Sequence, residues 1–140
     1  MSFQNLNNKV LRGYISSRDI NGAYYPQNIQ NLIIRNFASQ NNIKLQLSGT
    51  EWIIEKSFLM LRSLLREKND GIIFFSIFQV YENSNKFNKI INQILSKKKF
   101  LAFALENIQI QNKKELIDLE NKLKLNKIIN SKSFFKKYAK

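Results

Sequence analysis

The 140-residue chain contains no cysteine and no histidine. Thiolate nucleophiles, disulfide bonds, zinc sites built from Cys and His, and Ser-His triads within the chain are therefore excluded. Any acid–base chemistry must use Asp, Glu, Lys, Tyr or a group from outside the chain, such as a histidine of another protein.

Long hydrophobic runs are also missing. Uninterrupted apolar stretches such as residues 71–75 are far shorter than the ~20 residues that a membrane-spanning helix needs. The polar N-terminus lacks the basic-then-apolar order of a signal peptide. We therefore expect a cytoplasmic protein with no membrane span.

The chain lacks the glycine-rich loops that hold phosphate groups in nucleotide-binding proteins. Neither the G-x-G-x-x-G pattern nor the Walker lysine pattern follows the first expected strand, so no nucleotide cofactor is indicated. The acidic residues show no metal-ligand spacing, and we predict neither a cofactor nor a metal site. A magnesium site built from Glu51 and Glu106 is an alternative that the spacing leaves open.

Apolar and aromatic residues, by contrast, are plentiful. Hydrophobic residues make up 44% of the chain and aromatic residues 12%, which is enough to bury a core. The length suits one domain with a single core. We expect a flexible N-terminus at residues 1–8, one α/β domain at residues 9–130, and a basic, aromatic tail at residues 131–140.

The formal net charge of +13 is unevenly distributed along the chain. Nine Lys and Arg accompany six Asp and Glu before residue 86, whereas fourteen Lys accompany four acids from Lys86 onward. Lys, Asn and Ile, all abundant here, share A/T-rich codons. We therefore interpret most of the lysines as a solvated surface, and nucleic acid is not the favoured partner.

The apolar pattern predicts alternating strands and helices. Strands are expected near residues 9–16, 43–47, 72–78 and 100–105. Helices are expected near residues 26–40, 53–68, 85–99 and 112–130. Because parallel strands need helical crossovers, this order predicts a three-layer α/β domain with a mostly parallel four-stranded sheet and a long C-terminal helix.

Polar side chains gather where the expected strands end, which is where open α/β sheets bind their ligands. Glu51 is the candidate catalytic acid or base. For Ser48, as for Asn107, capping of a turn or helix is an equal alternative. The residues expected to bind substrate are Ser16, Ser17, Arg18, Gln27, Gln30, Asn31, Arg35, Ser48, Thr50, Ser76 and Gln79.

Arg18 and Arg35 are the strongest of these candidates. Arginine is scarce, with five residues against eighteen lysines, so codon composition does not account for it. Its planar guanidinium suits a carboxylate or a phosphate in a way that lysine cannot reproduce. The alternative for Arg35 is a structural ion pair with Glu51 or Glu55.

Four motifs follow one another along the chain: residues 14–17 (Tyr-Ile-Ser-Ser), Gln27 with Gln30, Ser48-Gly49, and Arg62 with Arg66. Their order resembles that of the catalytic domain of serine recombinases, and the similarity covers about residues 9–110. It implies a resolvase-like or flavodoxin-like fold.

The chain departs from that family at the residues that catalysis needs. Ser16 replaces the arginine ahead of the nucleophile, and Arg18 stands at the position of the nucleophilic serine. Residues 78–82 lack the family's Asp-Arg-x-x-Arg. Without these arginines a phosphodiester transition state has no charge clamp, so recombination is not expected.

Three longer runs carry a second resemblance. They are residues 12–18 (Arg-Gly-Tyr-Ile-Ser-Ser-Arg), 26–35 (Pro-Gln-x-Ile-Gln-Asn-Leu-x-Ile-Arg) and 47–51 (Leu-Ser-x-Thr-Glu). These runs are similar to a small bacterial family, the sporadic carbohydrate cluster proteins, and the similarity extends over nearly the whole chain. It implies a place in surface-polysaccharide or lipopolysaccharide biosynthesis without specifying a reaction.

Three functions follow as hypotheses. In the leading one, a cytoplasmic protein of surface-glycan biosynthesis binds or processes an anionic sugar or sugar phosphate at the carboxyl edge of the sheet. In the second, a catalytically inactive resolvase-like protein binds nucleic acid through Lys97–Lys99 and residues 132–140. In the third, the chain is a non-catalytic partner of a carbohydrate-cluster enzyme. Self-association through the aromatic tail is a further alternative, and the sequence does not decide whether the protein is an enzyme.

Overall fold

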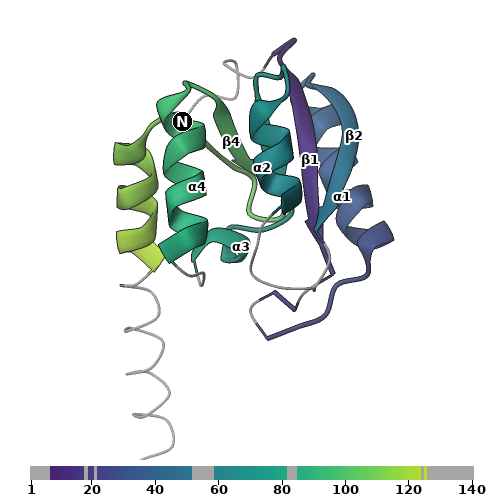
Figure 1. The fold of residues 1–140 in the computed structure, drawn as a ribbon. Helices are drawn as coiled ribbons and strands as arrows, with labels where there is room; N and C mark the ends of the chain where they lie inside the picture. Colours follow the sequence, from purple (N-terminus) through teal and green to yellow (C-terminus); the bar gives the residue numbers. More distant parts are fainter. Residues whose placement is uncertain are drawn as a thin grey trace, which may run out of the picture.

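A five-stranded sheet with helices on both faces forms the centre of the molecule (Figure 1). This computed structural model describes residues 7–17, 19–20, 22–51, 59–81, 85–123 and 125. Most of the expected flexible N-terminus, and all of the expected basic tail at residues 131–140, lie outside the described residues.

Strands and helices alternate along the chain as the apolar pattern predicts. The strands are β1 (Val10–Ser16), β2 (Lys44–Glu51), β3 (Gly71–Phe74), β4 (Phe100–Phe103) and β5 (Ile108–Ile110). The helices are α1 (Gln27–Gln40), α2 (Leu59–Arg66), α3 (Phe78–Tyr81) and α4 (Asn85–Ser96), and residues 113–123 are also helical. The sheet order is β2-β1-β3-β4-β5, and the first four strands are parallel. The α/β class and the mostly parallel sheet are thus confirmed.

The expected number of four strands is wrong, because β5 adds a fifth strand antiparallel to β4. A tight turn over residues 104–107 reverses the chain, with the Asn107 N–H donating to the Ala104 carbonyl at 3.2 Å. Asn107 has a φ of 57°, a left-handed conformation that asparagine tolerates. With only three residues, β5 is too short for its alternation to show in the sequence.

Several other elements differ in length from their expected ranges. Strand β2, expected at residues 43–47 and followed by a turn, continues to Glu51. The strand expected at residues 72–78 ends at Phe74, and the short helix α3 begins at Phe78. The expected helix at residues 112–130 is described as helical over 113–123, while most of its later part lies outside the described residues. No helix in the described ranges is long and apolar enough to span a bilayer.

The sheet separates two apolar clusters, which gives the molecule three layers. Ile72 and Phe74 of β3 are fully buried with residues of α2, α4 and the helix at residues 113–123. Ile73 of β3, and Phe75 immediately after the strand, are buried against α1 on the opposite face. Successive side chains of a strand point to opposite faces, so this continuous apolar run serves both clusters.

The pairing of β2 with β1 is interrupted by a β-bulge. Arg12 pairs with Gln46 and Tyr14 pairs with Gly49, so two residues of β2, Leu47 and Ser48, lie opposite Gly13. Leu47 is 84% exposed at the sheet edge. The extra residue shifts the alternation of β2, and the residues after the bulge face the opposite side from the one that a regular strand would give them.

Candidate functional site

Glu51, the candidate catalytic residue, lies buried at the carboxyl end of β2. Its Oε1 accepts hydrogen bonds from the Tyr14 hydroxyl at 3.1 Å and from the Leu61 N–H at 3.3 Å. Its Oε2 accepts a bond from the Met60 N–H at 3.1 Å. These amides belong to the first turn of α2, where N–H groups have no intrahelical partner and a negative charge is favoured. The carboxylate therefore joins β1 and β2 to the start of α2.

Ser16 and Ser17 extend the pairing between β1 and β2. Ser16 is buried and lies opposite Glu51 in the strand register. Beyond that pair, the backbone N–H of Ser17 donates to the Glu51 carbonyl at 3.1 Å, and the Ser17 hydroxyl donates to the same oxygen at 3.3 Å. Both serines therefore hold the ends of the two strands together.

Gln30 of α1 is fully buried and uses its amide inside the fold. Its Oε1 accepts a bond from the Ser16 N–H at 3.1 Å, and its Nε2 donates to the Ser16 carbonyl at 2.8 Å. The same nitrogen donates to the Tyr25 carbonyl at 2.8 Å. The side chain acts as an additional peptide group at the end of β1, and its burial keeps it out of reach of a ligand.

Ser76 and Glu106 are hydrogen-bonded at the start of the short helix α3. The Ser76 hydroxyl donates to Glu106 Oε2 at 2.7 Å, and the Ile77 N–H donates to Glu106 Oε1 at 2.8 Å. Gln79 accepts a bond from the Ser76 N–H at 3.1 Å through its Oε1. Glu51 and Glu106 thus each stabilise the first turn of a helix. Within the described ranges, no group of three or more acidic side chains could hold a metal ion.

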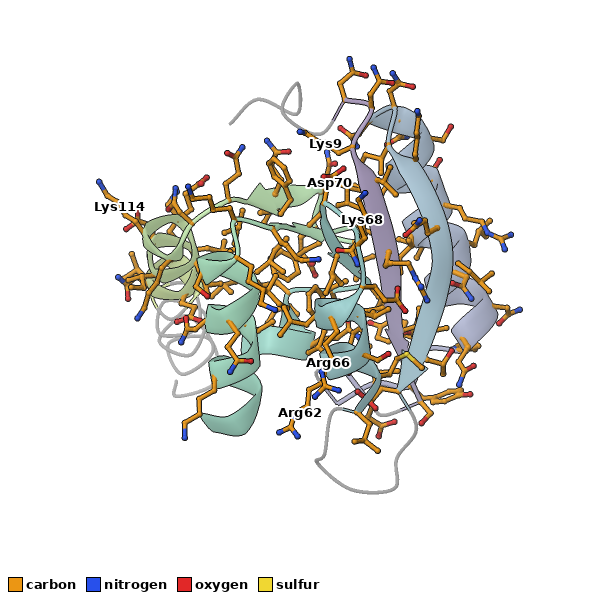
Figure 2. The ribbon with its side chains drawn as sticks, turned by 45° about the horizontal axis from the view of Figure 1, so that its top comes forward. Lys9, Arg62, Arg66, Lys68, Asp70 and Lys114 are labelled. Atoms are coloured by element: carbon orange, nitrogen blue, oxygen red, sulfur yellow. The ribbon has the colours of Figure 1, made fainter. Side chains whose placement is uncertain are left out.

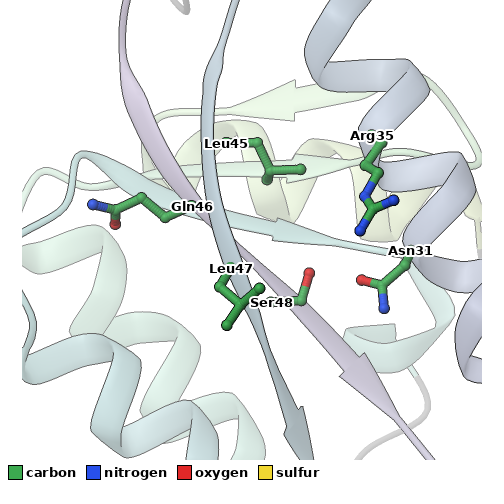
Figure 3. A pocket seen from close by; sticks show the side chains of 6 residues that line it. All are labelled: Asn31, Arg35, Leu45, Gln46, Leu47 and Ser48. Atoms are coloured by element: carbon green, nitrogen blue, oxygen red, sulfur yellow. The ribbon is translucent and has the colours of Figure 1, made fainter.

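A pocket of about 200 Å³ lies on the other face of the sheet, between α1 and β2 (Figure 3). Asn31 and Arg35 project into it from successive turns of α1, and Ser48 faces them from β2. Arg35 is exposed, and among the described residues it forms no ion pair. In particular it does not pair with Glu51, whose carboxylate is held by α2. The remaining lining residues are Leu45, Gln46 and Leu47.

The structure divides the expected site rather than assembling it. Asn31, Arg35 and Ser48 line one pocket on the α1 face, whereas Glu51 lies on the α2 face. Thr50 is half-buried opposite Ile15. Gln27 is the half-buried first residue of α1. Arg18 and Glu55 lie outside the described residues.

Three residues of the pocket were not expected from the sequence, namely Leu45, Gln46 and Leu47. The alternation of residues 43–47 places Leu45 inward and gives no sign of the bulge that follows it. The 84% exposure of Leu47 results from that bulge and has no local sequence signal. Comparison of the chain with protein-family models, with curated proteins and with solved structures finds no match.

Proposed function

We propose that this protein binds an anionic sugar intermediate of bacterial surface-polysaccharide or lipopolysaccharide biosynthesis in the pocket between α1 and β2. The observation that carries the proposal is Arg35, an exposed guanidinium without an acidic partner in the described residues, beside Asn31 and Ser48. The similarity of residues 12–18, 26–35 and 47–51 to the sporadic carbohydrate cluster proteins supplies the pathway.

The chemistry of the pocket suits a charged group attached to a polyhydroxyl ring. The Arg35 guanidinium offers a planar fork of N–H donors to a carboxylate or phosphate. The amide of Asn31 and the hydroxyl of Ser48 can each donate and accept, as recognition of sugar hydroxyls requires. Leu45 and Leu47 supply an apolar wall.

The size of the pocket limits the part of a ligand that it holds. Its volume of about 200 Å³ is below the roughly 300–1,000 Å³ that encloses a drug-sized ligand. We therefore assign the pocket to the anionic end of the intermediate, with the rest of the ligand extending along the exposed edge of β2. The resolvase-like or flavodoxin-like fold is part of the same proposal, supported by the reversal of strand order between β1 and β3.

Binding without turnover fits these residues better than catalysis does. The candidate acid or base, Glu51, faces α2 and accepts three hydrogen bonds there, on the opposite side of the sheet from Arg35. Among the described residues, none that lines the pocket carries a carboxylate. A binding role needs only the guanidinium and the neutral polar groups that the pocket provides.

The test is thermal denaturation of the protein with a panel of sugar acids, sugar phosphates and matched neutral sugars. A ligand that binds only the folded state raises Tm, and its stabilisation grows with the logarithm of one plus its concentration divided by Kd. We expect anionic sugars to stabilise the wild type, Arg35→Ala to lose the shift, and Arg35→Lys to recover part of it. Arg66→Ala, which removes an exposed arginine from α2, is the matched control and should keep the shift.

Two results would remove the pocket from consideration. One is an absence of stabilisation by every anionic sugar in the panel. The other is an equal loss of stabilisation in Arg35→Ala and Arg66→Ala, which would mean that net charge rather than this pocket attracts the ligand.

A further inference from the structure

Lysines that are scattered along the sequence come together at the amino ends of the parallel strands. Backbone hydrogen bonds align these ends in one row: the Lys44 N–H donates to the Lys9 carbonyl at 2.9 Å, and the Asp70 N–H donates to the Val10 carbonyl at 2.7 Å. The Phe100 N–H continues the row by donating to the Asp70 carbonyl at 2.9 Å. Lys9 precedes β1, Lys44 begins β2, Lys68 lies three residues before β3, and Lys97–Lys99 precede β4.

The antiparallel β5 brings two more lysines to the same edge, because it returns the chain to the level where β4 begins. Lys113 and Lys114 follow there, and Figure 2 shows Lys114 at the same end of the molecule as Lys9 and Lys68. We call the set of lysines at these strand ends the lysine edge: Lys9, Lys44, Lys68, Lys97, Lys98, Lys113 and Lys114. All of these lysines are exposed except Lys9, which is half-buried over the Phe100 ring.

The acids at this edge are already engaged within the fold. Asp70 Oδ2 accepts the Val10 N–H at 2.8 Å, and Glu67 pairs with Arg12. Glu115 accepts hydrogen bonds from the Gln111 N–H at 3.2 Å and from Asn112 at 3.1 Å.

Lys99 is excluded from the lysine edge because its ammonium group is also engaged. It donates to the Glu67 and Asn69 carbonyls and to Asn69 Oδ1, at 2.8–3.1 Å.

No lysine lies among the described loop residues at the carboxyl edge of the sheet, where Asp19 follows β1, Glu51 ends β2 and Glu106 follows β4. The nearest described cation is Arg62 in the first turn of α2, at the end of the molecule opposite Lys9 (Figure 2). The topology therefore concentrates described lysines at the amino ends of the strands. Counting lysines along the chain does not reveal this, because the grouping results from the topology.

Local helix energetics explain some of these lysines but not all of them. Lys68, Lys97 and Lys98 follow the carboxyl ends of α2 and α4, where a cation is favourable. Lys113 and Lys114 lie in the first turn of the helix at residues 113–123, where the exposed N–H groups disfavour positive charge. Their position therefore has a cost to the helix and requires a different explanation.

We propose that the lysine edge binds the phosphate backbone of nucleic acid without sequence specificity. Five neighbouring strand ends at a spacing of about 4.8 Å form a row of roughly 19 Å. Such a row covers about half of a helical turn of duplex DNA, which rises roughly 34–36 Å. Asn8, Asn42 and Asn112 are exposed among the lysines. The amides of Asn42 and Asn112 each donate one bond within the fold and keep a second N–H that can donate to a phosphate oxygen.

The composition of the edge favours nucleic acid over a lipid surface. Helices and loops that bind membrane interfaces present large apolar side chains beside their cations. The exposed large apolar residues of the described chain are Tyr24, Ile29, Leu32, Leu47, Leu59, Leu105, Ile117 and Leu125, and none of them belongs to the loops of the lysine edge. The exposed residues of these loops include Lys44, Lys98 and Asn42 rather than large apolar side chains.

The test is fluorescence anisotropy with a labelled DNA duplex of mixed sequence, titrated at several salt concentrations. We expect the logarithm of the binding constant to fall linearly with the logarithm of salt concentration. The variant Lys113→Gln/Lys114→Gln should reduce that slope by about 2, since each lost phosphate contact removes about 1. A duplex of unrelated sequence should give the same affinities.

The matched control is Lys89→Gln/Lys122→Gln, which removes the same charge from exposed positions away from the lysine edge. It should leave the slope unchanged. Equal effects of the two pairs, or binding insensitive to salt, would overturn the proposal. Binding to vesicles containing phosphatidylserine without binding to the duplex would also overturn it and assign the edge to a membrane surface. Arg35→Ala should bind DNA normally, so this result is independent of the sugar pocket.

Discussion

The hydroxyl of Tyr14 donates a hydrogen bond to the carboxylate of Glu51, with 3.1 Å between Tyr14 Oη and Glu51 Oε1. Both residues are buried, and the same carboxylate accepts two backbone amides from the first turn of α2. A residue that the sequence favours as an acid or base therefore organises three elements of the fold.

Replacing Glu51 with Ala should lower the free energy of unfolding by about 2 kcal/mol, because the first turn of α2 and the Tyr14 hydroxyl lose their acceptor. Urea denaturation measures this change. Asp118→Ala, at an exposed position, should change stability by no more than about 0.5 kcal/mol. A Glu51→Ala protein as stable as this control would show that the carboxylate does not hold α2.

Gln30→Leu and Gln27→Leu form a matched pair on the same helix. We expect Gln30→Leu to destabilise by about 1–3 kcal/mol, since the Ser16 N–H and the Ser16 and Tyr25 carbonyls lose their buried partner. Gln27 is half-buried at the first position of α1, and its replacement should cost much less. Chemical denaturation of both variants compares them, and equal costs would contradict the role given to Gln30.

Gly71→Ala should be destabilising by about 1–3 kcal/mol. A Cβ at Gly71 would overlap the Phe100 carbonyl oxygen and lie 2.8 Å from the Phe100 nitrogen, and neither backbone atom can move without breaking the pairing of β3 with β4.

Gly13→Ala offers a contrast, because the added Cβ would overlap the side-chain oxygen of Ser48. The second substitution Ser48→Ala removes that atom and should restore part of the stability. Thermal denaturation of the single and double variants measures the rescue, and its absence would show that the backbone, rather than Ser48, limits the space at Gly13.

Lys99 should make stability depend on pH in alkaline solution. Burial, followed by repulsion from Lys97, lowers the pKa of Lys99 below its ordinary value of 10.5, although Asp70 and Glu67 oppose the shift. Between the lowered pKa and 10.5, the unfolded chain binds more protons at this site than the folded chain does, so its contribution to stability rises with pH.

The unfolding free energy of the wild type minus that of Lys99→Gln should therefore increase as pH rises toward 10.5, and it should stay constant near neutrality. Denaturation at a series of pH values measures it, with Lys98→Gln as a control for the loss of one lysine. A difference that falls with rising pH would contradict the direction of the shift.

The sequence predicts the fold where periodicity is long enough to read. The continuous apolar run at residues 72–75 indicates a central strand, and the structure buries its side chains on both faces. On α1 the expected inward positions, Ile29, Leu32, Ile33 and Phe37, are only partly right. Phe37 is buried, but Ile29 and Leu32 are exposed because the helix turns Ile34 and Ala38 inward instead. The three residues of β5 carry too little pattern to be recognised.

The candidate site could be predicted only as a set of polar residues. Whether Gln30 or Glu51 contacts a ligand depends on partners far along the chain, including Ser16, Met60 and Leu61. No local pattern specifies those partners. Asn31, Arg35 and Ser48 meet in one pocket because the bulge turns Ser48 toward α1, and a bulge has no reliable signature in a single sequence.

The bulge at Leu47 and Ser48 makes the position of a deletion in β2 more important than the residue that is lost. Leu45 and Ser48 face α1, whereas Gly49 and Glu51 face α2. Deleting one residue between Leu45 and Gly49 would restore a regular strand and leave Glu51 facing α2, because the pairing of Gly49–Glu51 with β1 would not change. Deleting Thr50 would instead turn Glu51 toward α1, away from Tyr14 and the amides of Met60 and Leu61. A set of single-residue deletions along β2 should therefore show tolerance at the bulge and loss of stability two residues later.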